Sequence, residues 1–192
     1  MANMIPPELM LELYSEGLFP MTIKGEVRLF SPDPRGIIPL EEFRIPHGTR
    51  KTLRDPAWEI RLDTTFDEVV IGCAEREETW IDEGIFRSYV ALHRRGHAHS
   101  LEVWRDGTLA GGLYGVTIGA AFFGESMFHR VAGASKVAIC YLVEMLRAGG
   151  FQLLDTQWVT PHLEMFGARQ IRRDEYIKRL GAALQRRAFL SL

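Results

Sequence analysis

Cysteine is scarce in this chain of 192 residues, which has only Cys73 and Cys140, far apart in the sequence. Two distant cysteines exclude a disulfide framework and a cysteine-rich zinc site. Both lie in apolar segments with helical spacing, and such surroundings disfavour a reactive thiolate. We therefore do not expect a thiol nucleophile.

Long apolar runs and a strong excess of one charge are also missing. No stretch reaches the length of a membrane-spanning helix, and the N-terminal "MANMIPPELM" lacks a basic region followed by an apolar one. We therefore expect a cytoplasmic protein that does not bind membranes. The formal net charge of -2 at pH 7 gives no overall basic character, so any contact with nucleic acid would depend on a local patch.

Basic residues are nevertheless unevenly placed, with concentrations in residues 50–54, 93–95 and 168–187. For any one of these segments a solvated surface is the better interpretation. Taken together, they permit contact with an RNA backbone without requiring it.

Motifs of two common enzyme classes are absent. The sequence has neither G-x-S-x-G, typical of hydrolases, nor GxxxxGK[ST], which binds nucleotide triphosphates. The histidines His93, His97 and His99 have no acidic residue or cysteine at a spacing typical of metal sites, which favours packing or turn roles. We expect chemistry that needs no ATP, no metal and no other cofactor.

The sequence present falls into two parts of different character. Residues 1–62 hold most of the nine prolines, in turn segments, and include a helix predicted over about 7–16 that ends at Gly17. We expect a small N-terminal α/β subdomain over residues 1–62. Two helices are predicted next, one over 66–77 that opens with a capping box of Thr65 and Glu68, and one over 82–95.

Strand signals dominate the rest of the chain. Four segments have the pattern of β-strands: 100–104, 108–119, 120–128 and 151–159. A buried helix capped by Ser135 is predicted over 134–150, and a short helix over 160–168. This order predicts an α+β domain over residues 63–192 with a mixed, largely antiparallel sheet covered by helices.

Asp155 and Gln157 in "LLDTQ" are the first candidate site residues. Residues two apart in a strand share a face, so the two side chains should point the same way. A carboxylate can orient an amide, and the amide can then hold a reacting amine or carbonyl group. Alternatively, both side chains emerge into water at the end of a strand.

Glu125 lies in "AAFFGESMFHR", between two apolar pairs, where a carboxylate is costly to bury unless it is paired or used. Strand alternation places it on one face with Phe123 and Met127. It could pair structurally with Lys136 or Arg130, or it could belong to a site. If Glu125 and Asp155 meet across adjacent strands, they would form an anionic pocket that attracts a cationic substrate.

Several longer segments resemble the leucyl/phenylalanyl-tRNA–protein transferase family: "FSPDPRGIIPL", "TWI", "ALHRRGHAHSLEVWRDGTLAGGLYGV", "FFGESMF", "ASKVAI" and "GFQLLDTQWVTPHLEMFGA". The resemblance runs from about Ile5 to Leu180. It implies a small N-terminal domain and a GNAT-like acyltransferase domain. It also implies that Leu, Phe or Met moves from aminoacyl-tRNA to a protein that begins with Arg or Lys, which marks the product for degradation by the N-end rule pathway.

The resemblance also implies roles for individual residues. Asp155 and Gln157 match the family's D-x-Q pair, proposed to act on the attacking amine. Glu125 matches a glutamate near the acceptor's N-terminus, and Trp80 matches a position associated with the terminal adenosine of the tRNA. The pocket for the transferred side chain would be lined by the neighbours of Glu125: Phe123, Ser126 and Met127.

The sequence departs from the family pattern in two places. Many members have a "GGDL"-like segment before "GLFP", and that segment is absent from this sequence. Met21 stands where many members have a tryptophan that is expected to stack near the adenosine, so binding of the tRNA end would be weaker or achieved differently. Nothing in the sequence demands more than a monomer.

Two alternative functions remain open at this point. "RVAGA", residues 130–134, is similar to the R-x-x-G-x-A pattern with which GNAT N-acetyltransferases bind acetyl-CoA, and it lies between a predicted strand and a predicted helix. A catalytically silent relative that binds RNA or a peptide is the other alternative.

Overall fold

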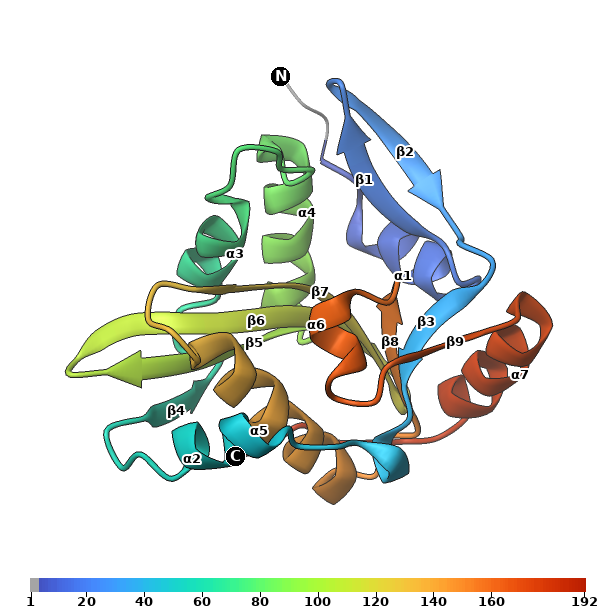
Figure 1. The fold of residues 1–192 in the computed structure, drawn as a ribbon. Helices are drawn as coiled ribbons and strands as arrows, with labels where there is room; N and C mark the ends of the chain where they lie inside the picture. Colours follow the sequence, from blue (N-terminus) through green and yellow to red (C-terminus); the bar gives the residue numbers. More distant parts are fainter. Residues whose placement is uncertain (1–3) are drawn as a thin grey trace.

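The computed structural model describes residues 4–192 as one mixed sheet with helices on both faces (Figure 1). The seven strands of this sheet lie in the spatial order β4-β5-β6-β7-β8-β3-β9. Their bounds are Arg35–Ile38 (β3), Glu59–Leu62 (β4), Ala98–Arg105 (β5), Thr108–Ile118 (β6), Ala121–His129 (β7), Leu153–Gln157 (β8) and Arg169–Ile171 (β9). Strands β7 and β8 pair in parallel and the other neighbours pair antiparallel, which confirms the predicted α+β class.

Helices cover both faces of the sheet because it is apolar on both. Helices α3 (Phe66–Ala74) and α4 (Glu83–Arg94) lie on one face, and α5 (Ala134–Ala148) lies on the other with α2 (His47–Leu53) beside it (Figure 1). Strand β6 is buried along nearly its whole length between these layers. The core therefore consists of two apolar clusters, one on each side of the sheet.

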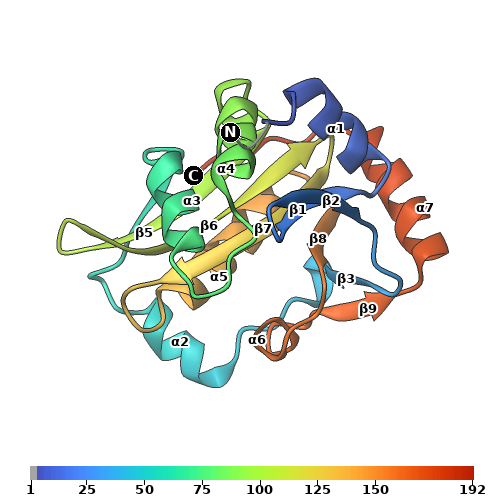
Figure 2. The same ribbon diagram turned by 90° about the horizontal axis from the view of Figure 1, so that it is seen from above.

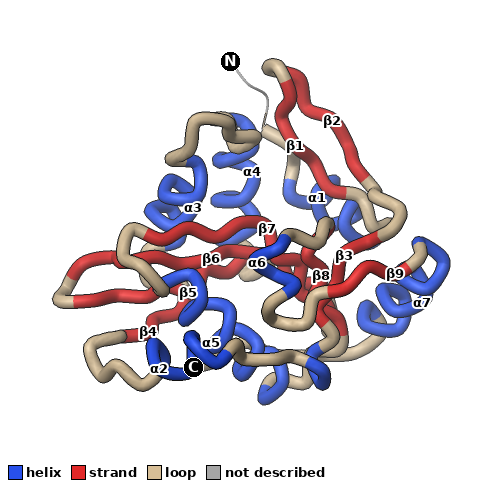
Figure 3. Tube along the Cα trace, in the orientation of Figure 1, coloured by secondary structure: helices blue, strands red, loops and turns tan. Residues whose placement is uncertain are grey.

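Helix α7 (Arg173–Leu184) packs on β7 and β8, two middle strands of the sheet. Helix α1 (Pro7–Ser15) lies beside α7, as Figures 1 and 2 both show. Strands β1 (Phe19–Ile23) and β2 (Glu26–Phe30) form a separate antiparallel hairpin that projects past the sheet (Figure 3). Two short elements complete the chain, a 3-10 turn over Leu40–Glu42 and α6 (Pro161–Glu164).

The part of the chain before residue 63 contributes to the main sheet. Strands β3 and β4 belong to the seven-stranded sheet, whereas α1 and the β1–β2 hairpin lie outside it. The predicted domain boundary between residues 62 and 63 therefore separates β3 and β4 from the other strands of the same sheet. The division into two domains stays a prediction. Among the helices of residues 4–192, none combines the length and the apolar character that crossing a membrane requires.

Two predicted helix caps differ in the structure. Thr65 is the N-cap residue of α3, but within the described residues its side chain makes no capping hydrogen bond. The buried Glu102 carboxylate instead accepts from the backbone N–H groups of Thr64 and Thr65. Helix α5 begins after Gly133, so Ser135 lies inside its first turn and is not the cap.

Strand β7 contains a β-bulge at the position of Glu125. Tyr114 of β6 pairs with Ser126 and the next residue, Gly115, pairs with Gly124, which leaves Glu125 as the extra residue. A side chain at Gly115 would lie 2.3 Å from the Phe123 carbonyl oxygen, so the close approach of the strands requires glycine there. Bulges redirect side chains and are frequent next to active sites.

Candidate active site

Glu125 is the centre of the site, and three side chains from three other elements donate to its carboxylate. The Tyr14 hydroxyl of α1 lies 2.7 Å from Oε1, and the Tyr89 hydroxyl of α4 lies 2.7 Å from Oε2. The Gln157 amide, at the end of β8, donates to Oε1 at 3.2 Å. The expected alternative of a pair with Lys136 or Arg130 is wrong.

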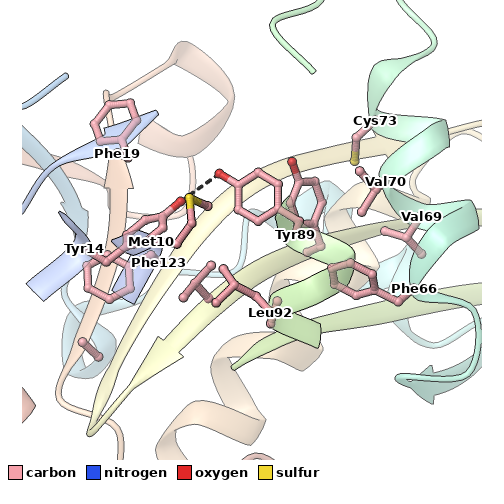
Figure 4. Packing of buried hydrophobic residues seen from close by; sticks show 14 of the residues in the cluster. Met10, Tyr14, Phe19, Phe66, Val69, Val70, Cys73, Tyr89, Leu92 and Phe123 are labelled. Carbon is pink, nitrogen blue, oxygen red and sulfur yellow. Dashed lines mark hydrogen bonds between the residues drawn. The ribbon is translucent and has the colours of Figure 1, made fainter. Parts of the chain in front are cut away.

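Arg130 instead binds Glu75, at 3.1 Å. Sequence proximity was misleading because the bulge turns Glu125 toward the cluster that contains α1 and α4. Figure 4 shows the hydroxyl groups of Tyr14 and Tyr89 facing each other in this cluster, 2.8 Å apart.

Burial raises the pKa of Glu125 from 4.5 to about 7. The hydroxyl groups of Tyr89 and Tyr14 lower it by hydrogen bonding, but the loss of water around the carboxylate outweighs them. Burial likewise raises the pKa values of both tyrosines well above 10, so both hydroxyl groups stay protonated. Glu125 therefore changes charge near neutral pH while its tyrosine donors do not.

The Gln157 backbone has a left-handed conformation, with φ of 55°. This conformation is uncommon for residues other than glycine and needs support from its surroundings. Asp155 provides that support, because its Oδ1 accepts from the Gln157 backbone N–H at 2.8 Å. On the neighbouring strand a side chain at Gly36 would lie 2.6 Å from the Trp158 carbonyl carbon, so glycine makes room for this turn.

Asp155 itself lies behind the site, fully buried between β3 and α7. The Arg35 guanidinium donates to both of its oxygens, at 2.9 Å and 2.7 Å, and Tyr176 donates to Oδ2 at 2.6 Å. Burial alone would lower the pKa of Arg35, but hydrogen bonding to Asp155 and the charge of Asp155 outweigh it and raise that pKa. Asp155 thus orients the main chain of Gln157, whereas the sequence suggested that it would orient the amide.

A cavity of about 420 Å³ lies in front of Glu125 and Gln157. Its wall is mostly apolar, with Ile38, Leu113, Ile139, Leu142, Leu154 and Leu163 among the lining residues. Phe19 and Trp158 also line it, with their rings edge to face at 5.2 Å, and Trp158 is 42% exposed. The cavity is therefore an apolar space with a carboxylate and an amide in its wall.

Most of the predicted site residues border this cavity. Glu125, Gln157, Trp80, Met21, Ser126 and Met127 line it, whereas Asp155 and Phe123 do not. Phe123 is fully buried and packs against the Tyr14 ring at 4.9 Å (Figure 4). Its predicted role as a pocket wall is therefore replaced by a role in holding Tyr14.

The bulge also corrects the expected strand faces. Phe123 belongs to the cluster under α1 and α4, whereas Met127 packs against the cluster under α5. The extra residue at Glu125 reverses the alternation between these positions. Met127 reaches the cavity because it lies on the α5 side.

Three buried polar atoms belong to residues that line the cavity, and within residues 4–192 they have no hydrogen-bond partner: Tyr114 Oη, Thr156 Oγ1 and His162 Nε2. A buried polar group without a partner costs about 1–3 kcal/mol. These three groups therefore lack a compensating hydrogen bond within residues 4–192.

Strand β1 is attached to the cavity rim near Trp80. The Thr22 backbone N–H donates to the Trp80 carbonyl oxygen at 3.2 Å, which holds Met21 beside the rim. Arg76 also lines the rim and donates to the Ser126 hydroxyl at 3.0 Å. The contact between β1 and Trp80 thus places Met21 at the cavity rim.

Several site residues escaped sequence reasoning. Tyr14, Arg35 and Tyr176 reach the site from distant segments, and Tyr89 reaches it from α4. Arg35 and Tyr176 could have been suspected only as polar residues without an obvious partner.

Both cysteines and the histidines His93 and His99 lie in structural settings. Burial raises the pKa values of Cys73 and Cys140 to about 12, which disfavours a nucleophilic thiolate. His99 contacts Asp63 at 2.7 Å, and the His93 ring stacks on Phe66. Among residues 4–192, no group of three or more His, Cys, Asp or Glu side chains is arranged to hold a metal.

Fold and site together define an α+β protein with an apolar cavity whose wall contains a titratable carboxylate, Glu125. Residues 37–181 match the family model described as leucyl/phenylalanyl-tRNA protein transferase. The chain belongs to this family.

Two curated relatives carry the same name, leucyl/phenylalanyl-tRNA--protein transferase. The relative from Herpetosiphon aurantiacus is 50% identical over 186 residues, which cover 96% of this chain and 97% of the relative. The relative from Paramagnetospirillum magneticum is 52% identical over 189 residues, which cover 95% and 90%. A solved GCN5-related N-acetyltransferase-like protein from Streptococcus suis is 14% identical, with 86% of this chain and 64% of that chain covered and a TM-score of 0.41, too low to support a conclusion about function.

Proposed function

We propose that this protein transfers leucine, phenylalanine or methionine from aminoacyl-tRNA to the α-amino group of a protein that begins with Arg or Lys. Membership of the family supports the reaction type. The contact between the Gln157 amide and the Glu125 carboxylate in the cavity wall is the observation that supports assigning the reaction to these two residues. An amide and a carboxylate side by side suit an ammonium group that must become an amine.

The reaction is ester aminolysis. The acceptor nitrogen attacks the carbonyl carbon of the aminoacyl ester, the C–O bond to the ribose breaks, and the ribose oxygen takes a proton as it leaves. Since replacing an ester by an amide is downhill, no energy donor is needed. The task of the protein is therefore to place two reactants and to manage the charge of the amine.

The apolar cavity wall suits the side chain of the transferred amino acid. Leucine, phenylalanine and methionine are all apolar, and burying one of their side chains is worth about 1.5–3 kcal/mol. The six aliphatic residues of the wall and Met127 provide such an environment. We propose that the 3′ adenosine lies at the rim, near Trp80 and Met21.

Gln157 is proposed to position the amine. Its amide nitrogen donates to Glu125, so the amide oxygen remains to accept a hydrogen bond from the amine. This polarity favours contact with the nucleophile over contact with the developing oxyanion, which needs donors. Asp155 is proposed to act indirectly, by holding the Gln157 backbone in its left-handed conformation.

The acceptor's first residue is proposed to be recognised by charge. Glu125 is ionised over part of the neutral pH range and borders the cavity, so it attracts a cationic N-terminus. We further propose that the protein works as a monomer in the cytoplasm and that its products enter the N-end rule pathway.

A direct assay tests the proposal. The protein is incubated with labelled Phe-tRNA and a peptide that begins with Arg, and product formation is followed by mass spectrometry. We expect a peptide extended by one Phe, and no extension of the same peptide with an acetylated N-terminus. Acetylation of the peptide from acetyl-CoA, or binding of Phe-tRNA without transfer, would contradict the proposal in favour of the two alternatives.

A further inference from the structure

Three side chains, Tyr14, Tyr89 and Glu125, form a closed ring of short oxygen–oxygen contacts at the site. The Tyr14 and Tyr89 hydroxyl oxygens lie 2.8 Å apart, Tyr14 lies 2.7 Å from Glu125 Oε1, and Tyr89 lies 2.7 Å from Glu125 Oε2. All three distances are in the range of O–H···O hydrogen bonds. Each contact therefore needs one hydrogen atom.

The number of hydrogen atoms depends on the charge of Glu125. Each tyrosine supplies one hydroxyl hydrogen, and an ionised carboxylate supplies none. Two hydrogen atoms then serve three contacts, and one pair of oxygen atoms faces each other with lone pairs only. A protonated Glu125 adds the third hydrogen, so that Glu125 donates to Tyr89, Tyr89 donates to Tyr14, and Tyr14 donates to Glu125.

We propose that Glu125, supported by the ring of hydrogen bonds through Tyr14 and Tyr89, is the base that takes the proton from the acceptor's α-ammonium group. This inference rests on the proposed function. It makes Glu125 a catalytic residue for the nucleophile, in addition to its attraction for a cationic N-terminus. Tyr14 and Tyr89 are positioning residues, since they act through Glu125.

The proton balance of the step is simple. The α-ammonium gives one proton to a Glu125 oxygen and becomes a neutral amine, while the hydroxyl groups reorient to close the ring. The amine forms the C–N bond, and the C–O bond to the ribose breaks. The second proton lost by the nitrogen goes to the ribose oxygen. Glu125 later releases its proton to water, so one proton leaves per peptide bond formed.

Asp155 is a poor candidate for this role. Its two oxygens already accept from Arg35, Tyr176 and the Gln157 backbone, and its side chain is fully buried away from the cavity. Glu125 borders the cavity instead. Of the two carboxylates near Gln157, Glu125 is thus the one that a bound amine can reach.

The surroundings of Glu125 suit a proton acceptor at neutral pH. The titratable and charged groups that act on it come from six elements: Tyr14 of α1, Arg35 of β3, Tyr89 of α4, Tyr114 of β6, Asp155 of β8 and Tyr176 of α7. Burial and the charge of Asp155 raise the pKa of Glu125 to about 7, while the tyrosine donors and Arg35 oppose the rise. The α-ammonium itself has a pKa of roughly 7.7–8, which is close enough for transfer.

The test compares pH profiles of kcat, and KM for the peptide, for wild-type protein, Glu125→Gln, Tyr14→Phe and Tyr89→Phe, with Tyr141→Phe as the control. Tyr141 is a partly buried tyrosine of α5 that does not line the cavity. At about pH 7 we expect Glu125→Gln to lower kcat by roughly 10²–10⁴-fold. The ratio of wild-type kcat to Glu125→Gln kcat should fall at least tenfold between about pH 7 and about pH 9, because the free amine is mostly neutral at the higher pH.

The tyrosine variants give a second readout. Each removes one donor to the ionised carboxylate, so the acidic limb of the profile should move up by roughly one pH unit, and Tyr141→Phe should not move it. Infrared difference spectra between wild-type protein and Glu125→Gln should show the band of a protonated carboxyl group. The pH midpoint at which this band disappears should match the midpoint of the acidic limb of the wild-type profile. This band can be measured without turnover.

Different results overturn different claims. If wild-type protein does not transfer Phe, the proposed function fails, whatever the infrared titration shows. If transfer occurs but Glu125→Gln only raises KM for the peptide, with kcat and its pH profile unchanged, Glu125 binds charge and is not the base. Profiles of Tyr14→Phe and Tyr89→Phe that match Tyr141→Phe would overturn the role of the ring.

Discussion

Arg35 and Asp155 form an ion pair with 2.7 Å between Nη2 and Oδ2, and both side chains are fully buried. The pair joins β3 to β8, and Arg35 also donates to the Gly17 carbonyl oxygen after α1. Its guanidinium lies over the rings of Phe19 and Tyr176. One cation thus connects the N-terminal segment, the sheet and α7 directly behind the candidate active site.

Arg35→Met should destabilise the fold strongly. Removing one partner of a buried ion pair leaves an uncompensated charge and costs about 3–5 kcal/mol. Urea unfolding at neutral pH measures this loss. Arg28→Met is the matched control, because Arg28 pairs with Glu26 on the surface, where such pairs contribute about 0–1 kcal/mol. Equal stability of the two variants would contradict the structural role of Arg35.

Asp155→Asn should affect stability as well as transfer. From the sequence alone, Asp155 is expected only to influence chemistry, so its replacement would leave folding intact. The structure changes this expectation, because a neutral amide at this position would leave the buried Arg35 charge without its anion, at a cost of about 3–5 kcal/mol. Urea unfolding measures this cost. Asp174→Asn, in an exposed pair with Arg172, should change the unfolding free energy by less than about 1 kcal/mol.

Glu125→Gln should make stability less dependent on pH. A carboxyl group with a raised folded-state pKa favours the folded state below its unfolded value, and this advantage is lost as pH rises from 4.5 to about 7. The full difference is roughly 3 kcal/mol. Relative to wild type, the variant should therefore gain up to about 3 kcal/mol in unfolding free energy between about pH 4 and about pH 8.

Chemical denaturation at several pH values measures this difference, with the exposed Glu12→Gln as a comparison. A difference between Glu125→Gln and wild type that does not vary with pH would show that Glu125 does not titrate in this range. The measurement is independent of transfer activity.

Met21→Trp should strengthen binding of aminoacyl-tRNA. Met21 lies at the cavity rim with Trp80, and stacking of a base on an aromatic ring contributes about 1–3 kcal/mol. We expect KM for Phe-tRNA to fall by roughly 5–150-fold with kcat little changed. Met165→Trp, at an exposed methionine that does not line the cavity, should leave KM unchanged. A KM that is unchanged or higher in Met21→Trp would place the adenosine elsewhere.

The sequence predicted the fold class and the order of the elements from α3 to α6, because those depend on local patterns. Apolar segments with strand patterns bounded by turn signals marked β6 and β7, and the apolar segment over α5 marked a buried helix. It also brought Glu125 and Gln157 forward as candidates, and the structure places them in contact.

The parts that escaped prediction depend on long-range geometry. The bulge at Glu125 arises from a register shift between β6 and β7, and no local pattern distinguishes one extra residue in a strand. Arg35 is 120 residues from Asp155 in the sequence, so the burial of its charge follows only from the placing of β3 beside β8. The same holds for Tyr14, 111 residues from Glu125.

The hydroxyl group of Tyr176 reaches Asp155 from α7, the last helix of residues 4–192. During synthesis on the ribosome, a growing chain that already exposes Arg35, Glu125 and Gln157 still lacks this support. The hydrogen bonds to Asp155, whose carboxylate fixes Gln157, are complete only once α7 has emerged and docked. Translation order therefore delays assembly of the site until residues 173–184 have been made.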